Sequence, residues 1–340
     1  MKSILKYLAE LMLVVVSLVG MGCEKTPTFY NETKDNKCSI ASKMELSDGI
    51  PREALSYTLE DYKGMLMAEI PVLAKRMSGD GHVISMEELS EIIDELEADY
   101  PGFNDSLPDE VINRIRADFP GVSDDELGAK AEEIVELYEA IKTYDLFQAL
   151  KEEAAVTGLA KSQGGNYPGG LSSEEFWLLF WNMGMKDGTE KASKEALAFA
   201  EQEFAGEGLW LTRGDGFRHA VWNALIAKHT GNKHKRVSDA IGWAKKFTDA
   251  HEKGGGTPSD PRDNPMDYHN NAEGREYFKT VGSVKKYKKF WFFGWHYGKK
   301  VVAPATSTIK SDVKAKTLQG TRFSDNSQLS GLGGRIVWIR

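Results

Sequence analysis

The chain has 340 residues, of which 41% are hydrophobic, 28% charged and 10% aromatic. Its 33 glycines and 11 prolines exclude collagen-like and low-complexity classes, and its two cysteines exclude a scaffold held by several disulfides. A formal net charge of −8 argues against a general nucleic-acid binder, so we expect no nucleic-acid partner. The length suggests about two domains.

The first residues have the features of an export signal. Lys2 and Lys6 give a basic start, and Leu11–Met21 is an uncharged apolar run. This run is shorter than the roughly 20 apolar residues that a membrane-spanning helix needs, but it fits the core of a signal peptide. A lipoprotein signal, an ordinary secretory signal and a short anchor all share this pattern, and each predicts an exported chain.

The end of this run resembles a bacterial lipobox, because Leu18–Cys23 reads LVGMGC with a small residue directly before the cysteine. The resemblance implies that Cys23 is lipidated, which makes the membrane the first expected partner. Glu24 then implies sorting to the outer membrane of a double-membraned cell. We therefore expect residues 1–22 to be a lipoprotein signal peptide and residues 23–50 to be a flexible polar tether.

An acidic helical domain is predicted for residues 51–162. Apolar residues recur there at helical spacing, and residues 51–150 carry 24 acidic and 8 basic side chains. Helix starts are indicated by Ser85 and Ser123, each followed three residues later by a glutamate, as in a capping box. The acidic surface is typical of solvated helix faces and would also suit a protein partner.

The segment Asp80–Glu87 partly matches a calcium-binding EF-hand loop. With Gly81 at position 6 of such a loop, Glu87 stands at position 12, but Arg76 stands at position 1, where a carboxylate is needed. We therefore favour an Asp-Gly turn leading into the helix that Ser85 caps, and leave calcium binding open.

A second helical domain, rich in histidine, is predicted for residues 172–280. It follows a turn-rich linker at 163–171 and precedes a basic aromatic tail at 281–340, which we expect to be irregular apart from a small strand at Ile336–Ile339. Ser172 and Glu175 form the capping box that starts its first helix. The predicted fold class is therefore mainly α: an acidic helical domain, a His-rich helical domain and an irregular tail.

The histidines concentrate in the second domain, where six of the seven lie between residues 219 and 296. Histidine serves as a general base near neutral pH and as a metal ligand. Three blocks, each at a predicted helix end, bring a histidine close to a carboxylate: Asp215 with His219, His251 with Glu252, and Asp267 with His269. Asp215 and Asp267 are predicted to cap the helices that they begin.

These blocks resemble an uncharacterised bacterial domain family found in exported proteins and lipoproteins. The resemblance rests on Phe217–Ala220 (FRHA), His251–Glu252 and Met266–Arg275 (MDxHNNxxGR), and it covers residues 205–280. It implies a compact helical domain with a shared polar site, but it supplies no reaction.

If the blocks converge, two chemistries are open. The first is a site for zinc or another divalent metal, with these candidate ligands: His219, His251, Asp267 and His269. The second is a metal-free His–carboxylate pair that activates water or a hydroxyl. The candidate catalytic residues are His219, His251, Glu252, Asp267 and His269. The candidate substrate-binding residues are Arg218, Asn270, Asn271 and Arg275. A buried structural network of the same groups remains the alternative.

The segment Lys285–Lys300 alternates lysines with aromatic residues, and residues 281–340 carry 12 basic and 2 acidic side chains. This pattern suits an anionic lipid surface, because aromatic side chains sit at the interface while lysines meet the head groups. The alternative is that the aromatic residues belong to the core and the lysines pair with the acidic domain.

The function that these features favour is an exported, lipid-anchored hydrolase acting on a phosphoester or a phospholipid. The first alternative is a non-catalytic envelope lipoprotein whose polar cluster is structural and whose acidic domain binds a partner. The second is a toxin-like nuclease, which the same histidines and basic tail would permit. No His-Glu-x-x-His or Gly-x-Ser-x-Gly motif is present, which disfavours zinc peptidases and serine hydrolases of those types.

Overall fold

The structure is a computed structural model, and it describes these parts of the chain: 40–47, 49–78, 83–100, 103, 107–157, 170–254, 258–291 and 294–340. The predicted signal peptide and the lipobox cysteine, Cys23, lie outside them. So do most of the tether, residues 163–169 of the predicted linker, and residues 79–82 of the loop compared with an EF hand. The predictions for those segments stay predictions.

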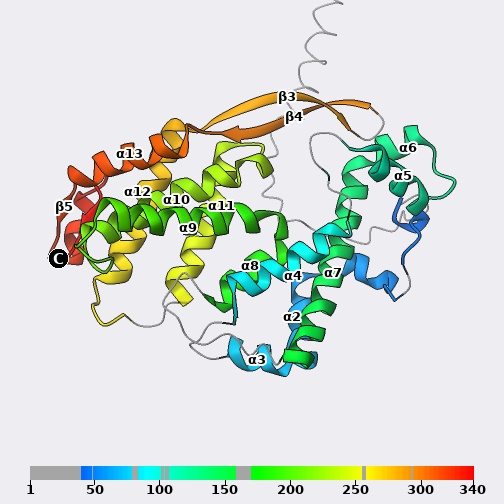
Figure 1. Ribbon diagram of the computed structural model, residues 1–340, viewed down its shortest axis with the longest axis horizontal. Helices are drawn as coiled ribbons and strands as arrows, with labels where there is room; N and C mark the ends of the chain where they lie inside the picture. The colour runs from blue at the N-terminus through cyan, green and yellow to red at the C-terminus, as the bar shows by residue number, and fades with distance from the viewer. Residues whose placement is uncertain are drawn as a thin grey trace, which may run out of the picture. The chain divides into compact units, whose positions relative to one another are not determined.

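The fold is mainly α, as predicted (Figure 1). Residues 40–157 form these elements, with η for a 3-10 helix: η1 (Ile40–Lys43), η2 (Arg52–Ser56), α2 (Leu59–Glu69), α3 (Pro71–Met77), β1 (Ile84–Ser85), α4 (Met86–Ala98), α5 (Asp109–Asp118), α6 (Asp124–Ala129) and α7 (Ala131–Thr157). The capping box predicted at Ser85 is present and starts α4. Ile40 and Met44 are buried, so packing begins inside the stretch predicted as tether.

Residues 170–340 form the second set of elements: β2 (Gly170–Leu171), α8 (Ser173–Trp181), η3 (Met183–Met185), α9 (Lys186–Glu203), α10 (Arg213–His229), η4 (Gly231–Lys233), α11 (Val237–Gly254), α12 (Asp263–Val281), β3 (Ser283–Trp291), β4 (Gly294–Val302), α13 (Thr306–Leu318), β5 (Thr321–Arg322), η5 (Asn326–Gly331) and β6 (Val337–Trp338). The capping box of Ser172 and Glu175 starts α8, as predicted. β2 pairs with β1 in an antiparallel manner.

Helix α10 is the central element of this second set. Of its 17 residues, 13 are buried, and it packs against α9, α11, α12 and α13 (Figure 1). A helix buried on nearly all sides must place its polar residues in the interior too. It therefore carries Asp215, His219 and Asn223 into the core, where each needs a partner.

The basic tail is more regular than the sequence suggested. β3 and β4 form an antiparallel hairpin in which Ser283 is paired with Val302 and Trp291 with Gly294. Helix α13 then packs against α10, and β6 pairs in parallel with β5. The sequence Ser283–Trp291 (SVKKYKKFW) carries lysines and aromatic residues on both faces of β3, so it lacks the period of two that would have predicted a strand.

Two helices start earlier than predicted. The N-cap of α10 is Thr212, whose side chain accepts a hydrogen bond from the backbone N–H of Asp215. Asp215 therefore lies in the first turn and is not the cap. Helix α12 starts at Asp263, so Asp267 lies one turn inside the helix. Asp267 consequently points toward His219 of α10, whereas Asp215 contacts the backbone N–H of Leu211 and side chains of its own helix.

The two predicted helical domains share buried apolar side chains. Tyr62 of α2 lies between Phe147 of α7 and Phe180 of α8, with ring centroids 5.9 and 5.4 Å away. The domain boundary at 163–171 stays a prediction. No helix in the described part of the chain has both the length and the apolar character needed to cross a membrane.

Replacing Gly274 by alanine should destabilise the protein, because α10 and α12 touch there through their backbones. A Cβ atom on Gly274 would lie 2.0 Å from the carbonyl oxygen of Ala220. Overpacking of this kind costs roughly 1–3 kcal/mol or more. Urea unfolding measures the loss, and a Gly274→Ala protein as stable as the original would contradict the packing described.

The control is Gly242→Ala in α11, where a Cβ atom would meet nothing within 4 Å. Alanine is the better helix former, so this variant should gain about 0.5–1 kcal/mol. Opposite changes in the free energy of unfolding for the same substitution in two helices would distinguish the effect of packing from that of helix propensity.

Candidate functional site

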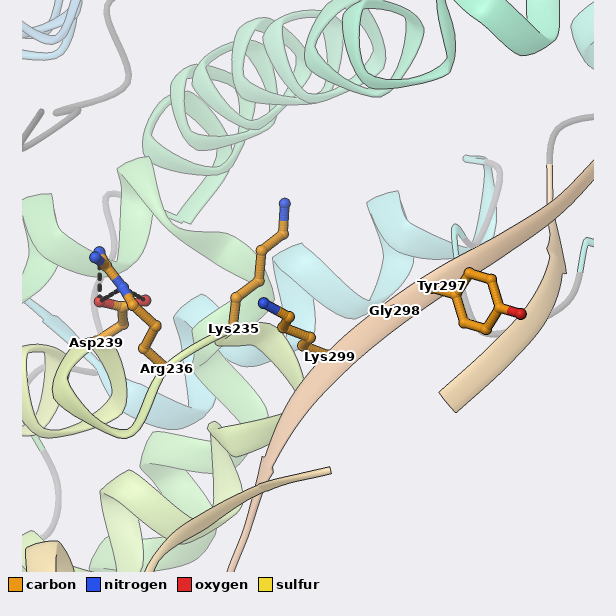
Figure 2. Close-up of a pocket in the computed structure, with 6 residues that line it drawn as sticks. All are labelled: Lys235, Arg236, Asp239, Tyr297, Gly298 and Lys299. Carbon is orange, nitrogen blue, oxygen red and sulfur yellow. Dashed lines mark hydrogen bonds and ion pairs between the residues drawn. The ribbon is translucent and has the colours of Figure 1, made fainter. Parts of the chain in front are cut away.

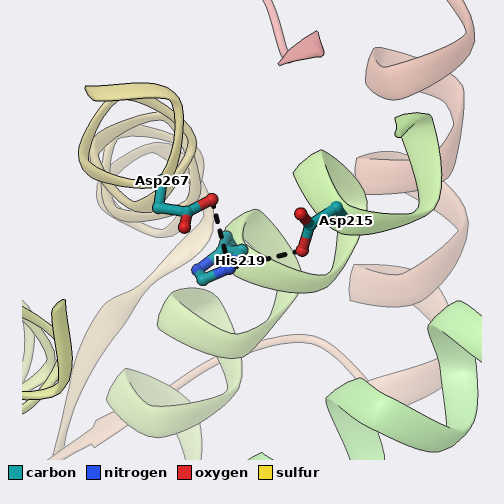
Figure 3. Close-up of side chains that lie close together, drawn as sticks. All are labelled: Asp215, His219 and Asp267. Atoms are coloured by element: carbon teal, nitrogen blue, oxygen red, sulfur yellow. Dashed lines mark ion pairs between the residues drawn. The ribbon is translucent and has the colours of Figure 1, made fainter. Parts of the chain in front are cut away.

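His219 lies at the meeting point of three helices. It is 1% exposed and projects from α10 toward Glu252 of α11 and Asp267 of α12. Nδ1 lies 3.3 Å from Oε1 of Glu252, and Nε2 lies 3.2 Å from Oδ1 of Asp267. Figure 3 shows the ion pairs that run from the ring of His219 to Asp267 and to Asp215. One residue from each of the three predicted blocks is therefore present at this meeting point: His219, Glu252 and Asp267.

The first turn of α10 adds a carboxylate and a guanidinium. Oδ1 of Asp215 lies 3.5 Å from Nε2 of His219 and 2.8 Å from Nη2 of Arg218. Oδ2 of Asp215 accepts a hydrogen bond from the backbone N–H of Leu211, at 2.7 Å. Nη2 of Arg218 also lies 2.8 Å from Nε2 of His219. Arg218 thus faces both the imidazole and the carboxylate.

Leu211 holds the start of α10 in place. Its φ of 64° lies in the left-handed region, which costs a non-glycine residue roughly 1–3 kcal/mol. Its carbonyl oxygen accepts from the backbone N–H groups of Ile339 and Arg340, at 2.9 and 2.8 Å. Through Leu211, the segment after β6 therefore fixes the residue that positions Asp215.

A series of hydrogen bonds between buried side chains holds Glu252 in place. Oε1 of Glu252 accepts from Asn271, whose side-chain oxygen accepts in turn from Asn223, at 2.9 and 2.6 Å. Arg275 and Thr248 donate to the side-chain oxygen of Asn223, at 2.8 and 3.2 Å. These contacts fix the orientation of Glu252, so they position the carboxylate that faces Nδ1 of the imidazole.

Burial and neighbouring charges shift the protonation equilibria of the site in opposite directions. Burial lowers the pKa of His219, but the carboxylates of Asp267 and Glu252 outweigh burial and Arg218 and raise it to about 10. Burial raises the pKa of Asp267 well above its ordinary value. Burial has the same effect on Asp215, yet Arg218 and His219 hold that pKa at about 2. The His219–Asp267 pair therefore retains one proton at neutral pH.

Three predicted site residues point elsewhere. Nδ1 of His251 lies 3.1 Å from Glu175 of α8. Nε2 of His269 faces the carbonyl oxygen of Arg335, at 2.8 Å. The side chain of Asn270 makes two hydrogen bonds of 2.9 Å with the backbone of Val337 in β6. His251 thus ties α11 to α8, and Asn270 ties α12 to the last strand.

The helical period explains which member of each block reaches the centre. Neighbouring helical residues point about 100° apart, so His251 and Glu252 cannot both face His219. Asp267 and His269 are two positions apart and lie on nearly opposite sides of α12. Met266, Asn270 and Gly274 are buried and stand four residues apart, so they mark the inner side of α12. His269 does not lie on that side, and this spacing would have removed it from the list of site candidates.

Asp215 was missed as a site residue, because its position suggested a helix cap. The signal was present, since Asp215 and His219 stand four residues apart and share a helix face. Asp215, His219 and Asp267 form the group in the described chain whose ligand atoms lie within 4.8 Å of one another. Of the predicted metal ligands, His219 and Asp267 belong to this group, whereas His251 and His269 do not.

Residues 177–292 match the model of a family described as a domain of unknown function (DUF6973). An uncharacterised domain family thus covers this part of the chain, and the match includes every residue of the cluster around His219. The match is wider than the 205–280 segment that carries the sequence blocks. No curated protein matched the chain.

The stability of the metal-free protein should fall as the pH rises from about 6.5 to about 10. His219 keeps its proton up to a pKa of about 10 in the folded state, against an ordinary value of 6.5 when unfolded. The folded protein therefore binds the extra proton in this window, and its stabilising effect disappears as the pH rises. The free energy of unfolding, measured in urea with a chelator present, should decrease by up to about 1.4 kcal/mol per pH unit.

The comparison is the double variant His219→Gln/Asp267→Asn, in which neither residue of the pair can hold the proton. Its unfolding free energy should depend less steeply on pH across the same window. Parallel curves for the two proteins would show that the pair does not retain a proton.

Proposed function

We propose that the protein is an exported hydrolase whose active centre is the cluster around His219. The observation that carries this proposal is the imidazole placed between carboxylates on both of its nitrogen sides, Glu252 at Nδ1 and Asp267 at Nε2. Such an arrangement orients the ring and stabilises a proton on it, which is what general acid–base catalysis of water attack requires.

The roles of the residues follow from their positions. Glu252, fixed by Asn271, orients the ring of His219. The His219–Asp267 pair holds one proton, so the side of the ring that carries Nε2 is where a leaving group would be protonated. Arg218 faces this side, and its side chain is 19% exposed, against 2% for that of His219. Arg218 is therefore the group through which an anionic substrate would enter and be held.

The proposed substrate class is a phosphoester or phospholipid at the cell envelope. Arg218 suits a phosphate group, because a guanidinium binds phosphate with parallel hydrogen bonds. The lipobox resemblance at Cys23 supports anchoring to the envelope, with the outer membrane as the proposed location. A lipid-anchored enzyme meets phospholipid head groups at high local concentration, which favours that substrate over a soluble one.

The hairpin β3–β4 is the proposed contact with an anionic lipid surface. Lys285 lies directly opposite Lys300, and Lys286 directly opposite Lys299. Like charges at directly opposed positions destabilise a strand pair. An anionic surface would neutralise both pairs. Tyr297, which is 81% exposed, adds an aromatic ring of the kind found at membrane interfaces.

A pocket at the side of the hairpin extends the basic surface. It is lined by Lys235, Arg236, Asp239, Tyr297, Gly298 and Lys299, and Figure 2 shows Lys235 and Lys299 next to each other. Arg236 is paired with Asp239, and Nζ of Lys235 lies 3.7 Å from Glu132, so Lys299 is the lysine of this pocket that would meet an anionic head group.

A second candidate function is a non-catalytic envelope lipoprotein whose polar cluster is structural. The observation in its favour is the continuous network through Asn223, Asn271 and Arg275, in which the side chains are buried and paired. Removing one member of such a network costs stability, because its partner is left buried and unpaired. The two functions therefore differ in what a conservative substitution does.

The activity test uses Asp267→Asn and Glu252→Gln in the chain beginning at Glu24. Hydrolysis should fall about 10²–10⁴-fold in both variants, because each loses a carboxylate that supports proton transfer. Turnover of a chromogenic phosphomonoester, a phosphodiester, DNA and phospholipid vesicles measures it. DNA as the best substrate would instead favour the nuclease.

The matched control is His229→Gln, which alters a histidine whose Nε2 lies 2.7 Å from Glu195, in a pair formed by other residues. It should leave turnover unchanged. No turnover on any of these substrates, together with a large loss of stability in the two site variants, would contradict the hydrolase and favour the structural network.

Binding to anionic vesicles should depend on the hairpin lysines. The variant replaces four of them by glutamine: Lys285, Lys286, Lys299 and Lys300. Each lysine near an anionic surface contributes about 1 kcal/mol, so co-sedimentation with phosphatidylglycerol vesicles should weaken at least roughly tenfold. Neutral vesicles should show no such difference.

The control variant replaces four lysines that are 56–64% exposed on helices: Lys191, Lys194, Lys245 and Lys279. It removes the same charge from other surfaces. Equal weakening by both variants would show that the total charge, and not the hairpin, determines binding.

A further inference from the structure

Three buried ligand atoms from α10 and α12 converge on one side of the His219 ring. Nε2 of His219 lies 3.2 Å from Oδ1 of Asp267 and 3.5 Å from Oδ1 of Asp215, as drawn in Figure 3. Two ligands of a tetrahedral zinc ion, with bonds of about 2.1 Å, stand about 3.4 Å apart. The spacing around Nε2 therefore matches the edges of a zinc coordination shell.

Hydrogen bonding alone leaves these atoms in conflict. Nη2 of Arg218 lies 2.8 Å from Nε2 of His219. If Nε2 accepts this hydrogen bond, its lone pair faces the oxygens of Asp215 and Asp267 and repels them. If Nε2 is protonated instead, its N–H meets the N–H of Arg218. A cation that accepts an electron pair from each of the three ligand atoms removes the conflict.

The carboxylate of Asp267 gives an independent sign of a missing cation. Asp267 is 7% exposed, and its Oδ1 has no hydrogen-bond partner among the described residues. Its contact with Nε2 of His219, at 3.2 Å, is an ion pair without hydrogen-bond geometry, and a buried carboxylate oxygen that has lost its water without gaining a donor is costly. This oxygen points at Nε2 of His219, which is the position where a shared ion would sit.

The charge balance of the cluster also favours a bound cation. Three carboxylates and one guanidinium surround the imidazole, so the inner groups carry two negative charges in excess when His219 is neutral. Asp263 and Arg275, farther out, offset each other. A divalent cation would bring the sum to zero, which a buried cluster strongly favours.

We propose that Asp215, His219 and Asp267 bind one divalent transition-metal ion, of which zinc is the best match to two carboxylates and an imidazole. Glu252, close to Nδ1, then completes the carboxylate–histidine–metal arrangement that orients a histidine ligand. Three protein ligands leave a coordination position open, which is the pattern of catalytic and not of structural zinc.

When no ion is bound, Arg218 makes contacts that the ion would otherwise make. Its Nη2 contacts the same oxygen of Asp215 and the same nitrogen of His219 that the ion would use. The ion and the guanidinium therefore compete for these atoms. Displaced from them, Arg218 becomes available to hold the anionic group of a substrate.

The proposed metal site adds a catalytic ion to the proposed hydrolase. The catalytic role of the ion rests on the proposed function, whereas zinc binding itself does not. A bound zinc ion lowers the pKa of a coordinated water toward neutrality, and this supplies the nucleophile for hydrolysis. His219 then acts as a ligand, and its ring is held by Glu252 in both the loaded and the unloaded protein.

The test is zinc binding to the purified full-length chain, measured by calorimetry and by metal analysis after dialysis. The protein should bind one zinc ion. Asp267→Asn and Asp215→Asn should each weaken binding at least about 100-fold, and Glu252→Gln about 10–100-fold. Arg218→Gln should bind zinc more tightly than the original protein, because the competing cation is gone.

The control is again His229→Gln, in which zinc binding should be unchanged. Circular dichroism and urea unfolding identify any variant that fails to fold, and Asp267→Asn removes no hydrogen bond from Oδ1. Zinc bound equally well by both aspartate variants would overturn the proposal. So would the absence of zinc from both the original protein and Arg218→Gln.

Activity separates this proposal from the hydrolase. Turnover that persists in a chelator, with no zinc bound, would overturn the catalytic role of the metal and leave the hydrolase standing. Zinc that binds as expected without turnover on any substrate would support the metal site and contradict the hydrolase.

Discussion

The fold of residues 170–340 depends on one constraint. Several charged side chains are buried together around a single imidazole, that of His219. Isolated carboxylates are not buried unless other groups satisfy them. Here Arg218 and His219 face Asp215, and Asn271 donates to Glu252. The helices α10, α11 and α12 can pack only in the arrangement that keeps these partners together, so the polar centre specifies the packing as much as the apolar side chains do.

The helices themselves were predictable from the sequence, because their start signals are local. Ser85 and Ser172 cap helices as their capping boxes predicted. The hairpin β3–β4 was not predicted, since β3 carries lysines and aromatic residues on both faces and such a run also reads as an irregular interfacial segment. Strand pairing depends on contacts between residues distant in sequence, and composition does not reveal them.

The centre of the site was partly predictable. His219, Glu252 and Asp267 were among the candidates because histidines and carboxylates cluster in sequence, and the structure brings these three together. His251 and His269 were candidates for the same reason but point to Glu175 and to the backbone of Arg335. Of two neighbouring residues on a helix, the one that faces inward depends on which side of the helix is buried. The helices packed against it determine that side.

The contact between Leu211 and the segment after β6 bears on the order in which the protein can mature. The residue that positions Asp215 is held by backbone groups more than 120 residues later in the chain. A ribosome or an export pore delivers a polypeptide from its N-terminal end. The helices of the cluster can therefore form while the chain is still emerging, but the contacts that hold Leu211 stay incomplete until residues 339 and 340 have been released.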